Sequence, residues 1–283
     1  MSATAESAGS YSVSSHDGII TVVIPAYNES GTVERCLRET HQTLDELGCR
    51  FEILLVDDGS SDDTLVRAKE VAAELPFTRI LGAPENQGKG ATLRYGARAA
   101  LGDLVLFMDA DMEVHPRQLS ILYAAMNGAH ADVAIGSKMH PRSTIDYALK
   151  RRVLSRGYYL LVRSLFRLPV RDTQTGLKLF RKVVLRRVGP RIVVKRFAFD
   201  LEVLVNVNRL GYRIVEAPVI VTRERDFPRV GVGSAVEVLW DTAAIWYRTY
   251  VLRYYDRIGP SIDRVVEEAA AFEEPARNRA DIA

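Results

Sequence analysis

The chain has 283 residues, of which 47% are hydrophobic, so it can bury one large core or a domain with an appendage. Its 38 Lys and Arg against 36 Asp and Glu give a formal net charge of +2, and this balance argues against nucleic acid as a partner. The basic residues nevertheless cluster between Lys138 and Arg196, where they could meet phosphates or an anionic membrane.

Neither the first residues nor the cysteines indicate secretion or membrane insertion. Residues 1–18 are rich in Ser and Ala and contain no apolar core, so we expect a disordered leader rather than a signal peptide. The chain contains no run of about 18 apolar residues, so no transmembrane helix is expected. Cys36 and Cys49 fit no metal-binding or disulfide pattern, which favours a reducing, cytoplasmic setting.

In the first half, short apolar runs alternate with segments of helical periodicity. We predict strands over 19–26, 51–56, 79–81 and 104–108, with helices over 33–47, 62–75 and 89–101 between them. This alternation predicts an α/β fold with a mostly parallel central sheet and right-handed crossovers.

The second half is more irregular. Helices are predicted over 116–126, 149–166 and 199–210, and strands over 132–136, 177–180 and 213–222. The basic, glycine-containing segment 223–233 is expected to form a flexible loop over the site. We therefore assign 19–233 to a catalytic domain, 234–256 to an amphipathic helix and 257–283 to a flexible tail.

Two carboxylates follow the predicted strand 104–108. Asp109 and Asp111 are two residues apart, and such positions point the same way in an extended chain. Because ligands bind beyond the carboxyl ends of strands in an open α/β sheet, the pair can share one target. A hard divalent cation carrying diphosphate oxygens suits it, although a loop or a helix cap would explain the same pattern without a ligand.

Several further motifs occur in a fixed order. The first half contains Pro25-Ala-Tyr-Asn-Glu29, Val56-Asp57-Asp58-Gly59-Ser60, Gly88-Lys89-Gly90 and Met108-Asp109-Ala110-Asp111. The second half contains Lys150-Arg-Arg-Val-Leu-Ser155-Arg156-Gly157, Asp172-Thr-Gln-Thr-Gly176-Leu-Lys178, Phe197-Ala-Phe-Asp200-Leu-Glu202 and Glu216-Ala-Pro218. Together they resemble glycosyltransferase family 2, and within it the polyprenyl-phosphate or dolichol-phosphate hexosyltransferases (mannosyltransferase or glucosyltransferase). The resemblance implies a single-domain, Rossmann-like nucleotide-diphospho-sugar transferase fold, called GT-A.

The resemblance also implies roles for individual residues. Nucleotide contacts fall on Pro25, Ala26, Tyr27, Glu29, Val56 and Asp58, with Lys89 opening a helix nearby. Metal and diphosphate contacts fall on Asp109, Ala110 and Asp111, with Glu113 as a third metal contact and Lys138 on a phosphate. The closing loop carries Arg223, Arg225 and Arg229, and the acceptor phosphate falls on Arg152, Ser155 and Arg156 unless these form only a solvated helix face.

By the same resemblance, the reaction is an inverting transfer of glucose or mannose from UDP-glucose or GDP-mannose to a polyprenyl phosphate, with Mg²⁺ or Mn²⁺ as cofactor. The segment Asp172 to Phe180 favours the glucosyl branch. A soluble phosphorylated or carboxylated acceptor is an alternative, and a non-catalytic nucleotide-sugar-binding protein is another.

The aromatic and basic residues of 234–256 indicate a helix in a membrane interface, which predicts a protein peripheral to the cytoplasmic face of a membrane or docked on a membrane-anchored partner. A packed terminal helix or a homodimer interface would explain the same composition.

Overall fold

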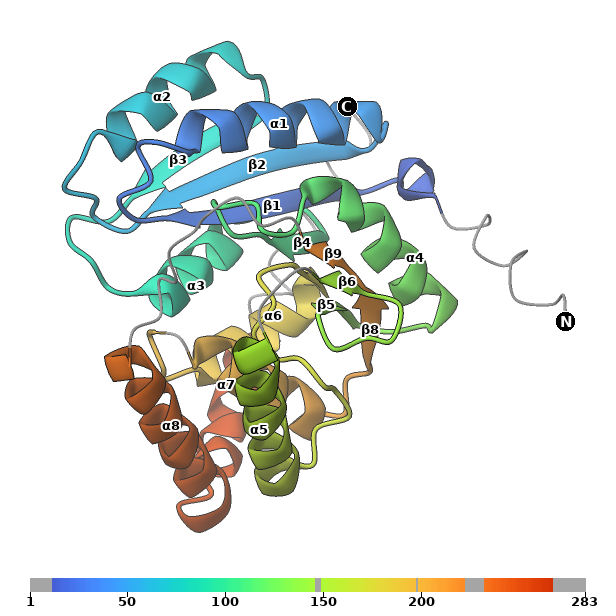
Figure 1. Ribbon diagram of the computed structural model, residues 1–283, viewed down its shortest axis with the longest axis vertical. Helices are drawn as coiled ribbons and strands as arrows, with labels where there is room; N and C mark the ends of the chain where they lie inside the picture. Colours follow the sequence, from blue (N-terminus) through green and yellow to red (C-terminus); the bar gives the residue numbers. More distant parts are fainter. Residues whose placement is uncertain (1–11, 146–148, 197, 222–231, 267–283) are drawn as a thin grey trace, which may run out of the picture.

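A seven-stranded sheet organises the computed structural model, which describes residues 12–145, 149–196, 198–221 and 232–266 (Figure 1). The strands run in the order β3-β2-β1-β4-β7-β5-β8. Their bounds are β1 (Ile19–Ala26), β2 (Arg50–Asp57), β3 (Thr78–Gly82), β4 (Leu104–Phe107), β5 (Val133–Ser137), β7 (Lys178–Arg181) and β8 (Ile214–Pro218). All neighbours pair in parallel except β7, which is antiparallel to β4 and β5. The prediction of an α/β fold with a mostly parallel sheet is confirmed.

Helices cover both faces of the sheet, in agreement with strands that are apolar on both sides. One core lies under α1 (Val33–Glu46), α2 (Thr64–Glu74) and α4 (Leu119–Gly128). The other lies under α3 (Lys89–Ala99), α5 (Leu149–Phe166), α6 (Lys182–Val188), α7 (Phe199–Arg209) and α8 (Val232–Trp246). In Figure 1, α1 and α2 lie above the sheet, and α3 and α7 lie below it. Helix α6 was not predicted, because it follows β7 without an intervening turn.

The strand predicted over 213–222 is interrupted. It consists of β8 and a separate strand β9 (Ile220–Val221), which pairs with β6 (Thr144–Ile145) in a second, two-stranded sheet. Pro218 ends β8 because proline has no amide hydrogen to continue the ladder. The next amide, that of Val219, donates instead to the hydroxyl of Ser143 at 2.9 Å.

Both ends of the described chain are more ordered than predicted. A 3-10 turn, η2 (Val13–Ser15), buries Val13, so the expectation of a disordered leader is wrong for residues 12–18. At the other end, α8 passes into a π-helical turn, η5 (Tyr247–Val251), and residues 254–266 are helical again. The predicted flexible tail is wrong up to residue 266, because the buried Arg191 donates to Asp263 at 2.8 Å. No helix in the described part of the chain is long and apolar enough to span a membrane.

Candidate active site

The loops that follow β1 and β2 are joined by hydrogen bonds at one rim of the sheet. The amide of Asn28 donates to Ser60 Oγ at 3.0 Å, and the amide of Ser61 donates to Asn28 Oδ1 at 2.9 Å. Asn28 has a left-handed φ of 54°, a conformation that asparagine tolerates. The neighbouring Tyr27 is 45% exposed, so its ring is available to a ligand.

Asp58 holds the start of α3. It is buried, and its two carboxylate oxygens accept the amides of Gln87 and Gly88, each at 2.9 Å. Gly88 has a φ of 97°, and a Cβ there would lie 2.6 Å from the carbonyl oxygen of Lys195. The predicted place of Asp58 beside base and ribose stays a prediction; what the structure adds is that this carboxylate fixes the residue before Lys89.

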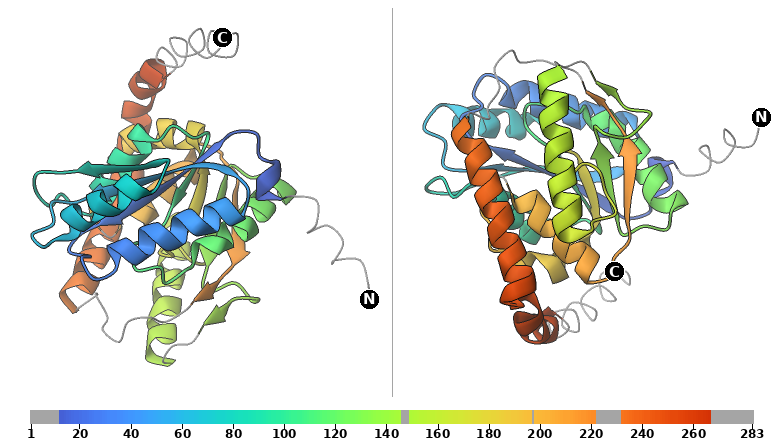
Figure 2. Two further views of the ribbon diagram at one scale, coloured as in Figure 1. Left: turned by 90° about the horizontal axis from the view of Figure 1, so that it is seen from above. Right: turned by 60° about the horizontal axis from the view of Figure 1, so that its bottom comes forward.

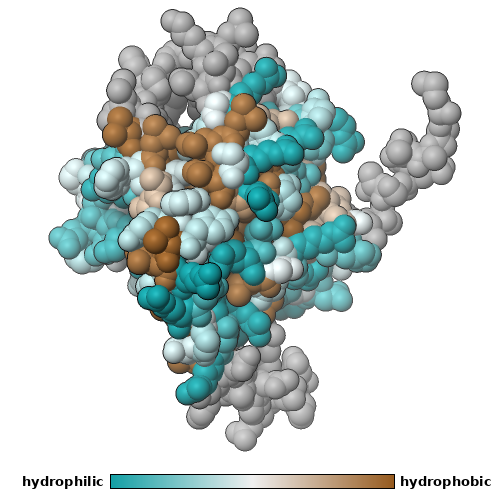
Figure 3. Space-filling model, turned by 90° about the horizontal axis from the view of Figure 1, so that it is seen from below, coloured by the Kyte–Doolittle hydropathy of each residue, from teal (hydrophilic) through white to brown (hydrophobic). Residues whose placement is uncertain are grey.

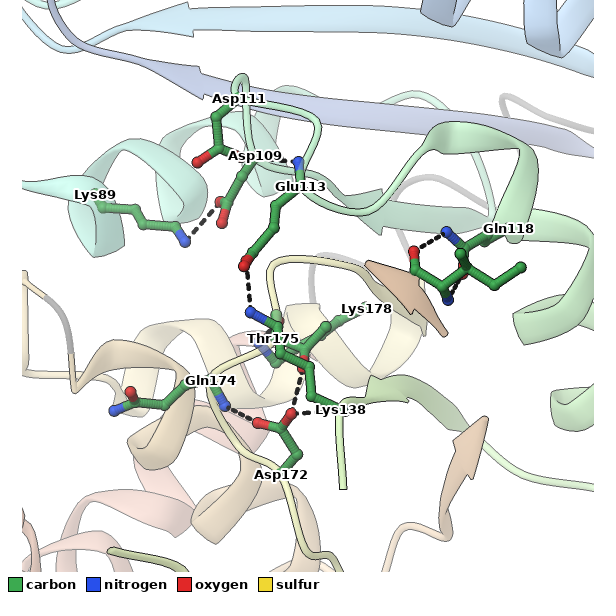
Figure 4. A network of polar contacts seen from close by, with 11 residues as sticks. Lys89, Asp109, Asp111, Glu113, Gln118, Lys138, Asp172, Gln174, Thr175 and Lys178 are labelled. Atoms are coloured by element: carbon green, nitrogen blue, oxygen red, sulfur yellow. Dashed lines mark hydrogen bonds and ion pairs between the residues drawn. The ribbon is translucent and has the colours of Figure 1, made fainter. Parts of the chain in front are cut away.

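Asp109 and Asp111 lie beyond the carboxyl end of β4, as predicted, and Lys89 faces them from α3 (Figure 4). Lys89 Nζ lies 2.6 Å from Asp109 Oδ1, and Asp111 Oδ1 accepts the amide of Glu113 at 3.1 Å. Burial acts to raise the pKa of Asp109, but the cations of Lys89, Lys178 and Lys138 lower it below its usual value. Burial and the neighbouring Asp109 charge raise the pKa of Asp111.

The loop before β7 closes the site from the opposite side. Gly176 packs so tightly on Asp109 that a Cβ at this position would lie 2.2 Å from Asp109 Oδ2. Two residues later, Lys178 is 1% exposed, and its ammonium donates to Asp200 Oδ1 at 2.8 Å and to the carbonyl of Thr175. Asp200 is therefore the partner of a buried cation.

Lys138 and Glu113 pair with each other at 2.5 Å. Lys138 had been predicted on a phosphate and Glu113 on a metal, so the structure brings both to the site but joins them in an ion pair (Figure 4). The Lys138 amide also donates to Asp172 Oδ2 at 2.8 Å, and the hydroxyl of Thr175 donates to the same oxygen. Asp172 thus organises the loop that carries Gly176.

The aspartate pair fits a divalent cation. Its donors are hard carboxylate oxygens, and the raised pKa of Asp111 reflects burial together with a like-charge repulsion from Asp109 that a cation would relieve. Within the described ranges, no three His, Cys, Asp or Glu side chains are grouped so as to hold a metal ion. Glu113, the predicted third contact, has one of its carboxylate oxygens paired with Lys138.

Other predicted residues are buried, exposed or outside the description. The side chains of Ala26, Val56 and Ala110 are 3%, 1% and 4% exposed and pack in the core, and the ligand contacts expected at these positions stay a prediction. Pro25 is half-buried, and Glu29 is buried, accepting the Thr32 hydroxyl at 2.7 Å.

On α5, Ser155 and Arg156 are exposed. No hydrogen bond among the described residues connects these two with the aspartate pair. The Arg152 side chain and residues Arg223, Arg225 and Arg229 lie outside the described part of the structure.

The sequence reasoning missed the role of Lys178 and of Glu216. Glu216 accepts the amides of Arg171 and Asp172 at 2.8 and 3.1 Å and so holds the loop from β8. Both residues belong to motifs noted in the sequence, but nothing in their spacing indicates their partners, which lie in other elements. A lysine within the otherwise apolar run 177–180 was the one available signal.

The parallel sheet with an antiparallel β7, together with two aspartates after β4 and lysines facing them, defines a nucleotide-sugar-dependent glycosyltransferase of the GT-A fold. The chain belongs to glycosyltransferase family 2, whose family model matches residues 21–189.

Similar curated proteins carry related names. Glycosyltransferase AglD of Haloferax volcanii is 34% identical over 202 residues, which cover 71% of this chain but 32% of AglD. A dolichyl-phosphate beta-glucosyltransferase of Trichomonas vaginalis is 31% identical over 252 residues, covering 84% of this chain and 76% of that protein. The dolichyl-phosphate beta-glucosyltransferase of Saccharomyces cerevisiae is 32% identical over 219 residues, which cover 71% of this chain and 66% of the yeast protein.

Among solved structures, glucosyl-3-phosphoglycerate synthase of Mycobacterium tuberculosis, in complex with Mn²⁺, UDP-glucose and phosphoglyceric acid, superposes with a TM-score of 0.65. The match covers 84% of this chain and 83% of the other at 20% identity. This likeness establishes the fold.

The pKa directions predict how a divalent cation stabilises the protein. Because the pKa of Asp111 is raised, its ionisation destabilises the folded protein as the pH rises from the usual carboxyl value to the raised one. Asp109, with a lowered pKa, contributes stability that is lost only as the pH falls through that lowered value. We expect MnCl₂ to raise the melting temperature more at about pH 7.5 than at about pH 5. Equal shifts at both pH values, or the same shifts in Asp111→Asn, would contradict this expectation.

Proposed function

We propose that this enzyme transfers glucose from UDP-glucose to a polyprenyl phosphate, with inversion at the anomeric carbon and with Mg²⁺ or Mn²⁺ at Asp109 and Asp111. The observation that carries the proposal is the cluster of lysines around the aspartate pair, at the rim where ligands of α/β sheets bind. The names of the relatives from Trichomonas and Saccharomyces support both the sugar and the lipid acceptor.

The chemistry requires stabilisation of a leaving diphosphate. A bound divalent cation would supply Lewis-acid stabilisation of the charge that develops on the leaving group. Lys89 already lies beside Asp109, and Lys138 is held close by through Glu113. Cations in these places stabilise a departing nucleoside diphosphate more than the intact donor, which is the condition for catalysis.

A lipid monophosphate also fits the two candidate bases of the site, because both carboxylates already have partners among the described residues. Asp200 is paired with Lys178, and Asp172 accepts hydrogen bonds from Gln174 and Thr175 of its own loop and from the amide of Lys138. An acceptor phosphate has a second pKa of about 6, so it reaches neutral pH largely ionised and needs no general base. Its own negative charge would need cations, and Arg156 on the exposed face of α5 is available for this role.

The proposal is tested by incubating the protein with radiolabelled UDP-glucose and, in parallel, GDP-mannose, each with a polyprenyl phosphate and MnCl₂. We expect an organic-extractable product with UDP-glucose and none with GDP-mannose. Product from GDP-mannose alone would assign the mannosyl branch instead. A water-soluble product with 3-phosphoglycerate, without any lipid product, would favour the soluble acceptor.

We further propose that the protein binds the surface of an anionic membrane through α5 and α8. The two helices lie side by side (Figure 2, right), and the hydroxyls of Tyr158 and Thr242 are 3.1 Å apart. α8 buries Thr242 and Ile245 against the core, yet its opposite face is also apolar. The large exposed apolar side chains of α8 and the following turn, among the described residues, are Val236, Leu239, Trp240, Trp246, Tyr247, Tyr250 and Val251.

Basic residues lie beside this apolar face. Seen from below, hydrophobic residues (brown) gather next to hydrophilic residues (teal) on this side of the molecule (Figure 3). On α5, Arg156 and Arg163 share the exposed face of Leu160 at helical spacing, and the exposed Arg167 follows the end of the helix. Arg163, Arg167 and Arg171 line a cavity of about 500 Å³, and no carboxylate of the described residues pairs with them. Aromatic and cationic side chains together favour a membrane interface rich in anionic lipids.

We expect the double variant Leu239→Ser, Trp240→Ser to bind phosphatidylglycerol vesicles about tenfold or more weakly, because it removes apolar area from the face. Val66→Ser, on the far side of the sheet, is the matched control because Val66 is also exposed, at 57%. Co-sedimentation with vesicles measures the difference. Equal loss in both variants, or unchanged binding in the double variant, would remove α8 from the membrane face.

A further inference from the structure

Residues 192–195 form a strap along α3. The amides of Gly90 and Ala91, at the start of α3, donate to the carbonyl of Lys195 at 2.8 and 3.2 Å. One turn on, Arg94 donates to the carbonyl of Ile192 at 2.9 Å. The first amides of a helix lack acceptors in the regular helical ladder, so the strap supplies the acceptor of Gly90 and a second acceptor for Ala91, whose amide also donates to the Gly88 carbonyl at 2.9 Å.

Glu202, on α7, holds the strap from the other side. It is completely buried, and its Oε2 accepts the amides of Val193 and Val194 at 2.9 and 2.7 Å. Its Oε1 accepts the hydroxyl of Tyr255 and the guanidinium of Arg248, the latter at 3.2 Å. One carboxylate therefore joins the strap to the C-terminal helical segment, which comprises α8, η5 and the helix at 254–266.

The strap and the start of α3 cannot move separately. A Cβ on Gly88 would lie 2.6 Å from the Lys195 carbonyl oxygen, and one on Gly90 would lie 2.5 Å from Phe199 Cβ. Lys89 stands between these two glycines and reaches Asp109 at 2.6 Å. A displacement of the strap would therefore displace the base of the lysine that faces the aspartate pair.

We propose that Glu202 is a positioning residue, which fixes Lys89 at the donor site and couples it to the C-terminal helical segment through Tyr255 and Arg248. This inference rests on the proposed function of Lys89 and Asp109 as part of the donor site. Buried hydrogen bonds to a charged group are strong and reinforce one another. Loss of a hydrogen bond between Glu202 and the C-terminal helical segment therefore weakens the hydrogen bonds between Glu202 and the strap. The same segment includes α8. The proposed membrane-binding face is therefore coupled to the position of Lys89 at the donor site.

Tyr255→Phe is the most specific test, because it removes the hydroxyl that donates to Glu202 and keeps the aromatic ring. Tyr254→Phe is its matched control: the two rings touch, with centroids 5.4 Å apart, but the Tyr254 hydroxyl makes no hydrogen bond with any described residue. In Tyr255→Phe we expect amide exchange of Gly90 and Ala91, and the KM for UDP-glucose, to rise roughly fivefold to tenfold. The KM for the lipid acceptor and both properties of Tyr254→Phe should stay at wild-type values.

A second variant guards against a merely structural effect. Glu202→Gln keeps the shape but removes the charge that Arg248 meets, and we expect the same local rise in exchange at Gly90 and Ala91. Exchange that rises evenly over the chain, or that rises at α3 without a change in donor KM, would overturn the positioning role. If wild-type protein transfers no sugar, the proposed function fails, and the exchange of Gly90 and Ala91 still decides whether Glu202 holds α3.

Discussion

Asp111→Asn is expected to lower kcat/KM for sugar transfer by about 10²–10³-fold, because it removes a charged ligand from the proposed cation site at the leaving diphosphate. The variant should fold, since it removes both the burial of a charge and the like-charge repulsion with Asp109, which together raise the pKa of Asp111. We expect its thermal stability without metal to equal or exceed that of the wild type. Steady-state kinetics and a melting curve measure the two effects on one preparation.

Asp63→Asn is the matched control for this variant. Asp63 is exposed at the start of α2, and its side chain makes no capping hydrogen bond, so the same chemical change there should leave transfer unaffected. Wild-type kcat/KM in Asp111→Asn would show that the aspartate pair does not carry the reaction. Equal losses in both variants would point to a general effect on folding.

Gly176→Ala is expected to reduce transfer by about a hundredfold, although it adds a single methyl group to a loop. That methyl would lie 2.2 Å from Asp109 Oδ2, so either the Asp109 carboxylate turns away from Lys89 or the loop moves off the site. Misplacement of about 1 Å at a reacting centre costs rate of this order. We expect the loss in kcat/KM for UDP-glucose, together with weaker UDP binding in the presence of MnCl₂.

Gly189→Ala tests whether this loss comes from the close approach. A Cβ at Gly189 meets nothing within 4 Å, so the same substitution there should preserve activity. If Gly176→Ala keeps full activity, then Asp109 either adopts another position when substrates bind or does not contribute to the reaction.

Much of the fold could be predicted from the chain because its local signals agree. Strands buried on both faces appear as short apolar runs, and the helices between them carry a clear stripe, so β1, β2 and β4 were placed within one residue at each end. The strand predicted over 213–222 was wrong because Pro218 interrupts it, and the antiparallel direction of β7 depends on tertiary packing. The helix at 254–266 escaped prediction because Asp263 has its stabilising partner, Arg191, on another element.

The candidate site was predictable where one segment carries the chemistry. Asp109 and Asp111 lie two residues apart just after β4, so their place beyond the carboxyl end of that strand follows from the predicted strand itself. The pairs Lys89 with Asp109 and Lys138 with Glu113 join residues 20 or more positions apart, and no local pattern encodes them. The buried Lys178 with Asp200 and the strap on Glu202 belong to the same class.

The anomeric configuration of the lipid product tests the central claim most directly. The protein is supplied with UDP-glucose labelled with ¹³C at the anomeric carbon, a polyprenyl phosphate and MnCl₂, and the organic phase is analysed by NMR. The account predicts a β-linked glucosyl phospholipid, inverted from the α-linked donor and absent in Asp111→Asn. An α-linked product, or label that remains in the aqueous phase as free glucose, would contradict it.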